Sequence, residues 1–437
     1  MTTIDQRIAN LSSAKRALLE QHLNRQAAQP AAQPTLAPPL ATGPWPLSFS
    51  QQRLWFIQQL EPENRAFHNG SVWQLIGALD VDALTRSLAE IVYRHAPLRT
   101  RLLIQEGEPV QSIDPPGAFH LPCLDLRQPT TSATNPMDQA QTLIHQLIQR
   151  PYDFTAEYAW RFQLIQLADD EHLLIAAHHH IASDGWSGGI FQRELSLLYT
   201  AFVQGNASPL PPLPMQYADF TIWQRKQLQG ARLEQQLTYW RRQLQNPPVL
   251  QLPTDYPRTA AQSHAAATYE FTLPASLTAA LKALSRKQGV TLYMTLLTAF
   301  KILLFRYTGQ QDLSVGAPIA GRSRAEAEAL IGFFLNTLIL RSQLKPASSF
   351  LELLDQVRQT TLNAYDHQDI PVEKLIEVLH QDHTLENNPL FQVLFLVQNM
   401  PRHPLVLPNL TVTNLRQAIG GASADLDCRL HENGDKL

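Results

Sequence analysis

The stretch HHHIASDGW, residues 178–186, decides how this sequence is interpreted, because it joins an apolar run to a polar turn. The run before it, Leu173–Ala177, is short and apolar, which is typical of a buried strand. Successive side chains of a strand point to opposite faces of its sheet, so His178 and His180 are predicted to share one face and His179 to point to the other. The sequence therefore places titratable side chains at the end of a buried strand.

Asp184 and Gly185 follow the histidines and are predicted to form a tight turn. Gly tolerates positive φ angles, and an Asp side chain can hydrogen-bond to its own backbone. A metal site would need His180 and Asp184 on one helical turn plus a third ligand, and the sequence has no partner cluster with ligand spacing. Two interpretations stay open from these residues alone. The histidines are hydrogen-bonded core residues, or one of them does acid–base chemistry, since His titrates at about pH 6.5.

Composition excludes several classes of function. The chain has 437 residues, 44% of them hydrophobic and 17% charged, which is enough for two hydrophobic cores. A net charge of -3, with no block of Lys or Arg, predicts neither nucleic-acid nor membrane partners. Only Cys123 and Cys428 are present, and both are expected to be buried. With no signal peptide and no membrane-spanning run, the sequence predicts a cytoplasmic protein without disulfides.

The chain divides into four predicted segments. Residues 1–25 have amphipathic spacing and are predicted to be helical, either packed on the body or docking to an upstream protein. Residues 26–46 are rich in Pro, Ala and Gln and are predicted to be a linker. Residues 47–222 are assigned to an N-terminal lobe and 223–437 to a C-terminal lobe, which is expected to stop short of its full length.

Helix and strand patterns alternate in both halves, so the predicted class is α/β or α+β, with two similarly built lobes. Helices are predicted over residues 80–95, 190–202, 275–288 and 292–307. Strands are predicted over residues 71–76, 99–104, 109–113, 173–177, 268–273, 312–316 and 426–430.

The pattern HHxxxDG, which residues 179–185 fill, resembles the core motif of the condensation domains of nonribosomal peptide synthetases. Six other segments resemble that family's motifs in the same order: SFSQQRLW (48–55), RHAPLRT (94–100), YADFTIW (217–223), IGFFLNT (331–337), HQDIPVE (367–373) and NPLFQV (388–393). One position departs from the pattern, because the family usually carries Glu after the His of the second motif and this chain has Ala96.

The resemblance implies both a fold and a reaction. Each lobe is expected to have the fold of chloramphenicol acetyltransferase, and the two lobes to form a V-shaped pseudo-dimer with a central tunnel. The expected reaction is amide-bond formation, in which the amine of an acceptor aminoacyl thioester attacks a donor acyl or peptidyl thioester. Both units are held on the phosphopantetheine arms of donor and acceptor carrier domains. The chain itself is expected to bind no cofactor, and an adenylation domain is expected beside it in a full synthetase.

The resemblance also assigns roles to residues. His180 matches the second His of the motif and is expected to accept a proton from the amine or to position it. Asp184 is expected to support the His loop, beside His179, by pairing with Arg99 or Arg322. Gly185 is expected to serve the turn or to offer its N–H to the oxyanion. The residues expected to line the tunnel or contact substrate are His178, Ser183, Trp186, Ser187, Tyr217 and Asn336, and Asn336 is also expected to bridge the lobes.

Three alternatives stay open beside the condensation reaction. A free-standing acyltransferase would use a soluble thioester with the same base. Cyclising relatives usually replace both histidines with an aspartate pattern, and epimerising relatives differ after the glycine, where this chain has Trp186 and Ser187. A non-catalytic scaffold that recruits partners is disfavoured by the intact His180 and Asp184.

Overall fold

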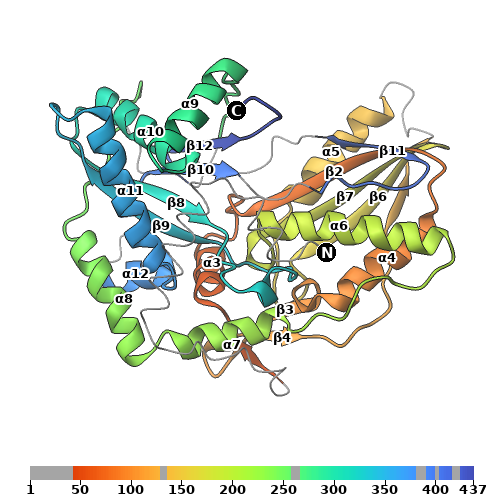
Figure 1. Cartoon of the computed structure of the whole chain (residues 1–437). Coiled ribbons are helices and arrows are strands. Elements are labelled where there is room, and N and C mark those ends of the chain that lie inside the picture. Colours follow the sequence, from red (N-terminus) through yellow and green to blue (C-terminus); the bar gives the residue numbers. More distant parts are fainter. Residues whose placement is uncertain (1–42, 128–134, 257–265, 380–389, 399–402, 416–423) are drawn as a thin grey trace.

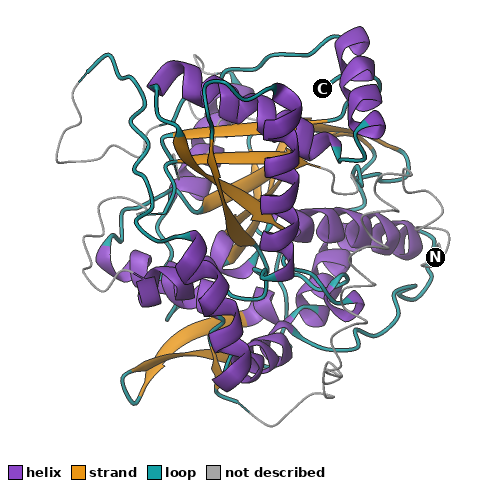
Figure 2. Ribbon diagram, turned by 60° about the vertical axis from the view of Figure 1, so that its left-hand side comes forward, coloured by secondary structure: helices purple, strands orange, loops and turns teal. Residues whose placement is uncertain are grey.

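The computed structural model describes residues 43–127, 135–256, 266–379, 390–398, 403–415 and 424–437. The predicted helical segment at residues 1–25 and most of the predicted linker lie outside these residues. Two β-sheets stand side by side, each packed against helices, and helix α3 (Phe49–Leu60) lies between them (Figure 1). Figure 2 shows from another side how helices surround the strands.

The N-terminal lobe is built on a five-stranded sheet in the order β11-β2-β7-β6-β5. Its strands are β2 (His68–Gly77), β5 (Cys123–Asp125), β6 (Trp160–Ala168), β7 (Glu171–His179) and β11 (Leu410–Leu415). The central strand β7 pairs antiparallel with both β2 and β6. Because β7 is central, the histidines at its end lie between two neighbouring strands.

Helices cover both faces of this sheet. On one face, α4 (Val81–Arg94) and α6 (Gly185–Val203) enclose the larger core of the lobe. On the other face, α5 (Pro136–Gln149) packs over a smaller apolar cluster. Helix α4 forms where it is predicted, because Asp80 caps its first turn by accepting the N–H of Ala83, and an apolar stripe faces the core.

A small three-stranded sheet has the order β1-β4-β3. It contains β1 (Trp45–Pro46), β3 (Thr100–Gln105) and β4 (Glu108–Ile113). Trp45 pairs with Gln111 and Pro46 with Val110, so the end of the predicted linker is a strand and that boundary is wrong. Helix α3 begins at a capping box in which the Ser48 hydroxyl accepts the N–H of Gln51.

The C-terminal lobe has a four-stranded sheet in the order β12-β10-β8-β9. Its strands are β8 (Asp312–Ile319), β9 (Asn336–Gln343), β10 (Val393–Gln398) and β12 (Leu426–His431), and its helices are α8 (Gly230–Gln243), α9 (Ala275–Lys287), α10 (Leu292–Thr308), α11 (Phe350–Asp366) and α12 (Val372–Leu379). Helices α9 and α10 match the prediction, and Gly289 and Gly309 adopt positive φ angles just after their ends.

The predicted division at residue 222 departs from the structure in two ways. Residue 222 lies inside helix α7 (Tyr217–Gln227), which runs below both sheets in Figure 1. Strand β11 follows most of the C-terminal lobe in sequence, yet it pairs antiparallel with β2 and completes the N-terminal sheet. A segment assigned by sequence to the C-terminal lobe therefore supplies a strand of the N-terminal sheet.

Two local predictions are also wrong. Residues 268–273 form no strand, and this segment is largely exposed. One backbone hydrogen bond, from the Leu273 N–H to the Leu437 carbonyl, is made at its end. Cys123 is exposed rather than buried, because it lies on the edge strand β5. Within the described ranges, no single helix is long and apolar enough to cross a membrane, and α9 with α10 meets that criterion only as a pair bent by 108°.

Candidate active site

His180 stands where strand β7 gives way to a single 3₁₀ turn, His180–Ala182. The residue is half-buried, and its ring Nδ1 lies 3.0 Å from the backbone oxygen of Ser183. A carbonyl oxygen can only accept a hydrogen bond, so Nδ1 carries the proton. The neutral ring therefore keeps the lone pair of Nε2 for another partner.

The protonation state of His180 follows from its surroundings. Burial lowers the pKa of His180 below 6.5, and the charge of Arg429 acts in the same direction. The hydrogen bond to Ser183 and the carboxylate of Asp184 oppose this shift. The imidazole is therefore neutral at pH 7, which is the form that accepts a proton.

The other two histidines of the stretch lie in aromatic surroundings. His178 stacks on Trp160 with 4.5 Å between ring centroids, and burial lowers its pKa to about 3. His179 is fully buried on the side of the sheet where Tyr152 and Phe154 lie, and its Nδ1 accepts the N–H of Ile181 at 3.0 Å. His179 thus holds the turn that presents His180.

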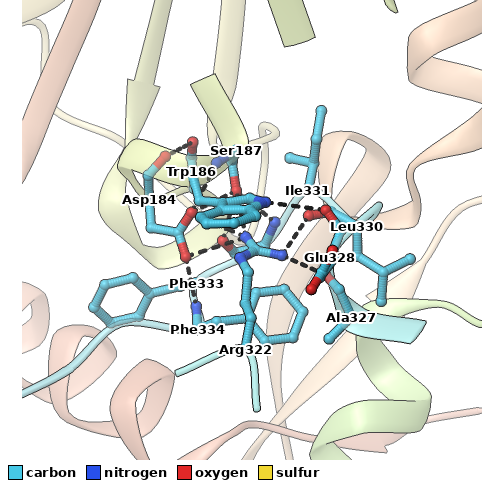
Figure 3. Close-up of polar contacts among 12 residues, drawn as sticks. Asp184, Trp186, Ser187, Arg322, Ala327, Glu328, Leu330, Ile331, Phe333 and Phe334 are labelled. Carbon is cyan, nitrogen blue, oxygen red and sulfur yellow. Dashed lines mark hydrogen bonds and ion pairs between the residues drawn. The ribbon is translucent and has the colours of Figure 1, made fainter. Parts of the chain in front are cut away.

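Asp184 ties the motif to the C-terminal lobe. Its carboxylate caps helix α6 by accepting the Ser187 N–H at 2.9 Å, and it accepts Arg322 Nη2 at 3.0 and 3.2 Å (Figure 3). The ion pair is almost fully buried, with 1% of the Arg322 side chain and 3% of the Asp184 side chain exposed. Arg322 also donates to the carbonyls of Ala327 and Leu330, so its guanidinium is held at several points.

Residues 331–334, which we call the 331–334 segment, come from the C-terminal lobe. Each of the four residues forms a backbone hydrogen bond to a side chain of the N-terminal lobe. The Ile331 N–H donates to His95 Nδ1 at 3.3 Å, and the Gly332 N–H to the Ser187 hydroxyl at 3.1 Å. The Phe333 carbonyl accepts the Tyr217 hydroxyl at 2.6 Å, and the Phe334 N–H donates to Asp184 at 3.0 Å. This segment places the Phe333 ring 5.9 Å from the His180 ring.

A profile of the condensation domain matches residues 42–423 of this chain. The chain belongs to the condensation-domain family. It is 43% identical over 400 residues to a linear gramicidin synthase polypeptide from Brevibacillus parabrevis, covering 90% of this chain and 8% of that protein. It is 43% identical over 402 residues to phosphinothricin tripeptide synthetase PhsC from Streptomyces viridochromogenes, covering 91% of this chain and 37% of that protein. The domain thus spans a minor part of each relative.

Solved structures show the same fold. The X-domain from teicoplanin biosynthesis superposes with a TM-score of 0.83 at 28% identity, covering 92% of this chain and 88% of that chain. The first condensation domain of the CDA synthetase superposes with a TM-score of 0.70 at 23% identity, covering 89% and 90%. The predicted family and the mixed α/β class are therefore confirmed.

Of the two arginines considered for Asp184, only Arg322 makes the ion pair. Arg99 donates instead to the backbone carbonyl of Asp114, at the end of β4, so its predicted support of the His loop is wrong. Burial lowers the pKa of both guanidinium groups. The sequence could not distinguish them, because the two arginines occupy matching segments of the two lobes.

Gly185 does not form the predicted turn. It is the first residue of helix α6, and its φ angle is not positive. The polar turn is instead the N-terminus of a helix, with Asp184 as its cap. The N-terminus of α6, which carries a partial positive charge, therefore follows the histidine turn directly.

Three residues expected to line a tunnel are buried. Ser183 and Ser187 are 0% exposed and Tyr217 is 1% exposed, so none of them offers a substrate surface. Ser187 and Tyr217 hydrogen-bond to the 331–334 segment, whereas the Ser183 carbonyl bonds to His180. Trp186 is half-buried and donates its indole N–H to the Glu328 carbonyl at 3.0 Å (Figure 3). His178 is also half-buried as a residue, but its Nδ1 is buried and its ring stacks on Trp160.

Asn336 does not bridge the lobes. Its amide donates to the Gln368 and Ile370 carbonyls, and its oxygen accepts the N–H of Val372. All these partners lie in the C-terminal lobe, so Asn336 fixes the segment before α12. Asn336 does line a pocket, together with Trp223, Gln227, Ser323 and Phe333.

Sequence reasoning missed the contacts of the second motif. His95 and Glu194 are both 1% exposed, and His95 Nε2 lies 2.9 Å from the Glu194 carboxylate. Glu194, on helix α6, thus meets the His of the motif although Ala96 replaces the usual Glu. Glu194 lies 99 residues after His95 in the sequence, so the sequence gives no sign of this pairing. Among the described residues, no group of three or more His, Cys, Asp or Glu could hold a metal ion.

Proposed function

We propose that this condensation domain joins two thioester-bound units by an amide bond. The amine of the acceptor unit attacks the carbonyl carbon of the donor thioester, and the C–S bond of the donor then breaks. One proton leaves the nitrogen and is delivered to the departing thiolate. The donor chain is thereby transferred to the acceptor amine.

The free lone pair of His180 is the observation that carries this proposal. An α-amino group has a pKa of about 8, so some group has to accept a proton as the C–N bond forms. The hydrogen bond from Nδ1 to Ser183 leaves Nε2 as that acceptor, and the lowered pKa of His180 keeps it unprotonated. General-base help contributes a factor of about 10² to 10⁴, whereas fixing two reactants contributes about 7–11 kcal/mol. Positioning of the two thioesters therefore dominates the rate, with His180 as acceptor or orienting group.

The helix that follows the motif supports the charged intermediate. The first N–H groups of α6 lie just beyond Asp184, and a helix N-terminus stabilises negative charge. The N–H of Gly185 is the one proposed to face the oxyanion. The phosphopantetheine arms of donor and acceptor carrier domains are proposed to reach His180 between the two lobes, with an adenylation domain beside this one in the full protein.

The reaction is tested with two carrier proteins, one loaded with a donor and one with an acceptor aminoacyl thioester. Mass spectrometry should show the extended product on the acceptor carrier with the wild-type domain and its loss with His180→Ala. The exposed His120→Ala is the matched control and should turn over like wild type. Full turnover by a folded His180→Ala variant contradicts the proposal, and product from free pantetheine thioesters alone identifies the soluble-thioester enzyme instead.

A recruiting role is the second candidate. The specific observation in its favour is the TM-score of 0.83 to the X-domain of teicoplanin biosynthesis, which has also been solved in complex with OxyB. A scaffold needs no free base, so a domain that forms no product with loaded carriers but binds a second protein would fit this role.

A further inference from the structure

Three rings form a closed cluster on the α5 side of the N-terminal sheet. The centroids of His68 and Tyr152 lie 5.1 Å apart, those of His68 and His179 5.5 Å apart, and those of Tyr152 and His179 5.8 Å apart. His68 and His179 are 0% exposed and Tyr152 is 4% exposed. In the described part of the chain, His68 Nε2, His179 Nε2 and the Tyr152 hydroxyl are buried without a hydrogen-bond partner. Buried polar atoms in native proteins are almost always hydrogen-bonded, so three together need a common explanation.

The proton positions on both imidazoles follow from their other nitrogens. His68 Nδ1 lies 3.0 Å from the Ile148 carbonyl and therefore donates, which leaves Nε2 as an acceptor. His179 Nδ1 accepts the Ile181 N–H, so in the neutral ring Nε2 carries the proton and is a donor. Burial lowers the pKa of His68 to about 4 and holds that of His179 well below 6.5, so both rings are neutral at pH 7.

The cluster thus offers one donor, one acceptor and one hydroxyl that can do either. A metal ion does not fit, because His179 Nε2 carries a proton. An anion does not fit either, because the lone pair of His68 Nε2 would face it. Buried water typically makes about three hydrogen bonds to such groups. We propose that His68, Tyr152 and His179 bind one buried water molecule, which accepts from His179, donates to His68 and bonds to the Tyr152 hydroxyl.

Each ring is held in place independently of this water. The Arg161 guanidinium lies 3.6 Å from the centroid of the Tyr152 ring and donates to the carbonyls of Arg150 and Pro151. His68 is fixed by Ile148, and His179 by Ile181. The site is therefore built before the water enters, and the water closes a network around the first His of the motif. Through the Ile181 N–H, this network positions the turn that starts at His180.

A crystal structure of the wild-type domain at high resolution tests the site directly. The expected result is one ordered water within hydrogen-bond distance of His68 Nε2, His179 Nε2 and the Tyr152 hydroxyl. Empty density between the three rings, or a direct bond between the two imidazoles, overturns the proposal.

The direction of a stability change gives a second test. Tyr152→Phe keeps the ring but removes one partner of the water, so we expect its Tm to fall by a few degrees, because buried groups lose a hydrogen bond. Tyr293→Phe is the matched control, since the buried Tyr293 hydroxyl also has no partner in the described residues and packs near Phe395. Its Tm should stay the same or rise. An unchanged or raised Tm for Tyr152→Phe, as in this control, contradicts a water network.

Discussion

Each lobe places a basic side chain in a buried setting, and we propose a chemical role only for the one in the N-terminal lobe. In the N-terminal lobe, His180 is half-buried at a strand end and leaves Nε2 free. In the C-terminal lobe, Lys301 on α10 is 1% exposed, and its Nζ donates to the Leu340 carbonyl and the Ser342 hydroxyl, both at 2.7 Å. Burial lowers the pKa of both groups, that of Lys301 to about 7.

The difference shows that a lowered pKa alone does not mark a catalytic residue. Lys301 is enclosed by its own lobe and holds strand β9 to α10. His180 instead stands next to the segment that the other lobe contributes, with Phe333 beside it. Accessibility and a free lone pair, rather than titration, separate the proposed base from the structural lysine.

Removing each of these two side chains in turn should give the largest expected effect, which is on turnover. His180→Ala should lower the turnover of two loaded carriers by about 10² to 10⁴ while the Tm stays near that of wild type. Lys301→Met should do the reverse and keep turnover while it changes stability. Assays of both variants with the same carriers and by thermal melting check this crossover. Loss of turnover in a folded Lys301→Met would contradict the division of roles.

Loss of the Asp184–Arg322 ion pair between the lobes should give the largest decrease in the free energy of unfolding. Asp184→Ala leaves the buried Arg322 guanidinium unpaired and should cost about 3–5 kcal/mol or give insoluble protein. Arg99→Ala should cost clearly less than Arg322→Ala, because Arg99 has no buried carboxylate partner of this kind. Denaturant unfolding of the soluble variants measures the order. An equal cost for both arginines would show that the ion pair does not hold the lobes.

Lys301 predicts how stability depends on pH. Its folded pKa of about 7 lies below its unfolded value of 10.5, so between these values the unfolded chain binds more protons. Stability should therefore rise with pH above 7, with a slope that reaches about 1.4 kcal/mol per unit between pH 8 and 9.5, and this slope should be absent in Lys301→Met. Urea unfolding at several pH values tests this, and equal slopes in both proteins would contradict it.

A smaller effect is expected at Gly332 in the 331–334 segment. A Cβ there would lie 2.2 Å from Tyr217 Cδ2, so the segment can follow its path only with glycine at this position. Gly332→Ala should destabilise the domain by about 1–3 kcal/mol and move Phe333 away from His180. Gly188→Ala is the control, because a Cβ there meets nothing within 4 Å. Equal stability of the two variants would mean that the contact between Gly332 and the Tyr217 ring does not require glycine at position 332.

Much of the fold could be predicted from local patterns. Helix α4 has a capping Asp and an apolar stripe, and α9 and α10 end before glycines, so each carries its own start or stop signal. Strand β11 could not be placed, because its alternation says nothing about which sheet it joins. The segment at 268–273 has a strand pattern but no partner strand in the described residues, and pairing decides whether a strand forms.

The candidate site was predictable in its motif and not in its contacts. The histidines and Asp184 are adjacent in sequence, so their pattern alone singles them out. The partners of Asp184 come from residues 322 and 334, and only the packing of the two lobes brings them there. The turn expected at Gly185 is instead the start of helix α6. The tunnel-lining roles given to Ser187 and Tyr217 were wrong because both side chains are buried against the 331–334 segment.

The protonation of the His180 ring is the most direct test of this account. Nitrogen NMR of the domain labelled with ¹⁵N-histidine, with the His180 signal assigned by its loss in His180→Ala, reports which ring nitrogen carries the proton. At pH 7 we predict a neutral ring with the proton on Nδ1 and an unprotonated Nε2. A proton on Nε2, or a charged ring at this pH, would contradict the assignment of His180 as the group that accepts the amine proton.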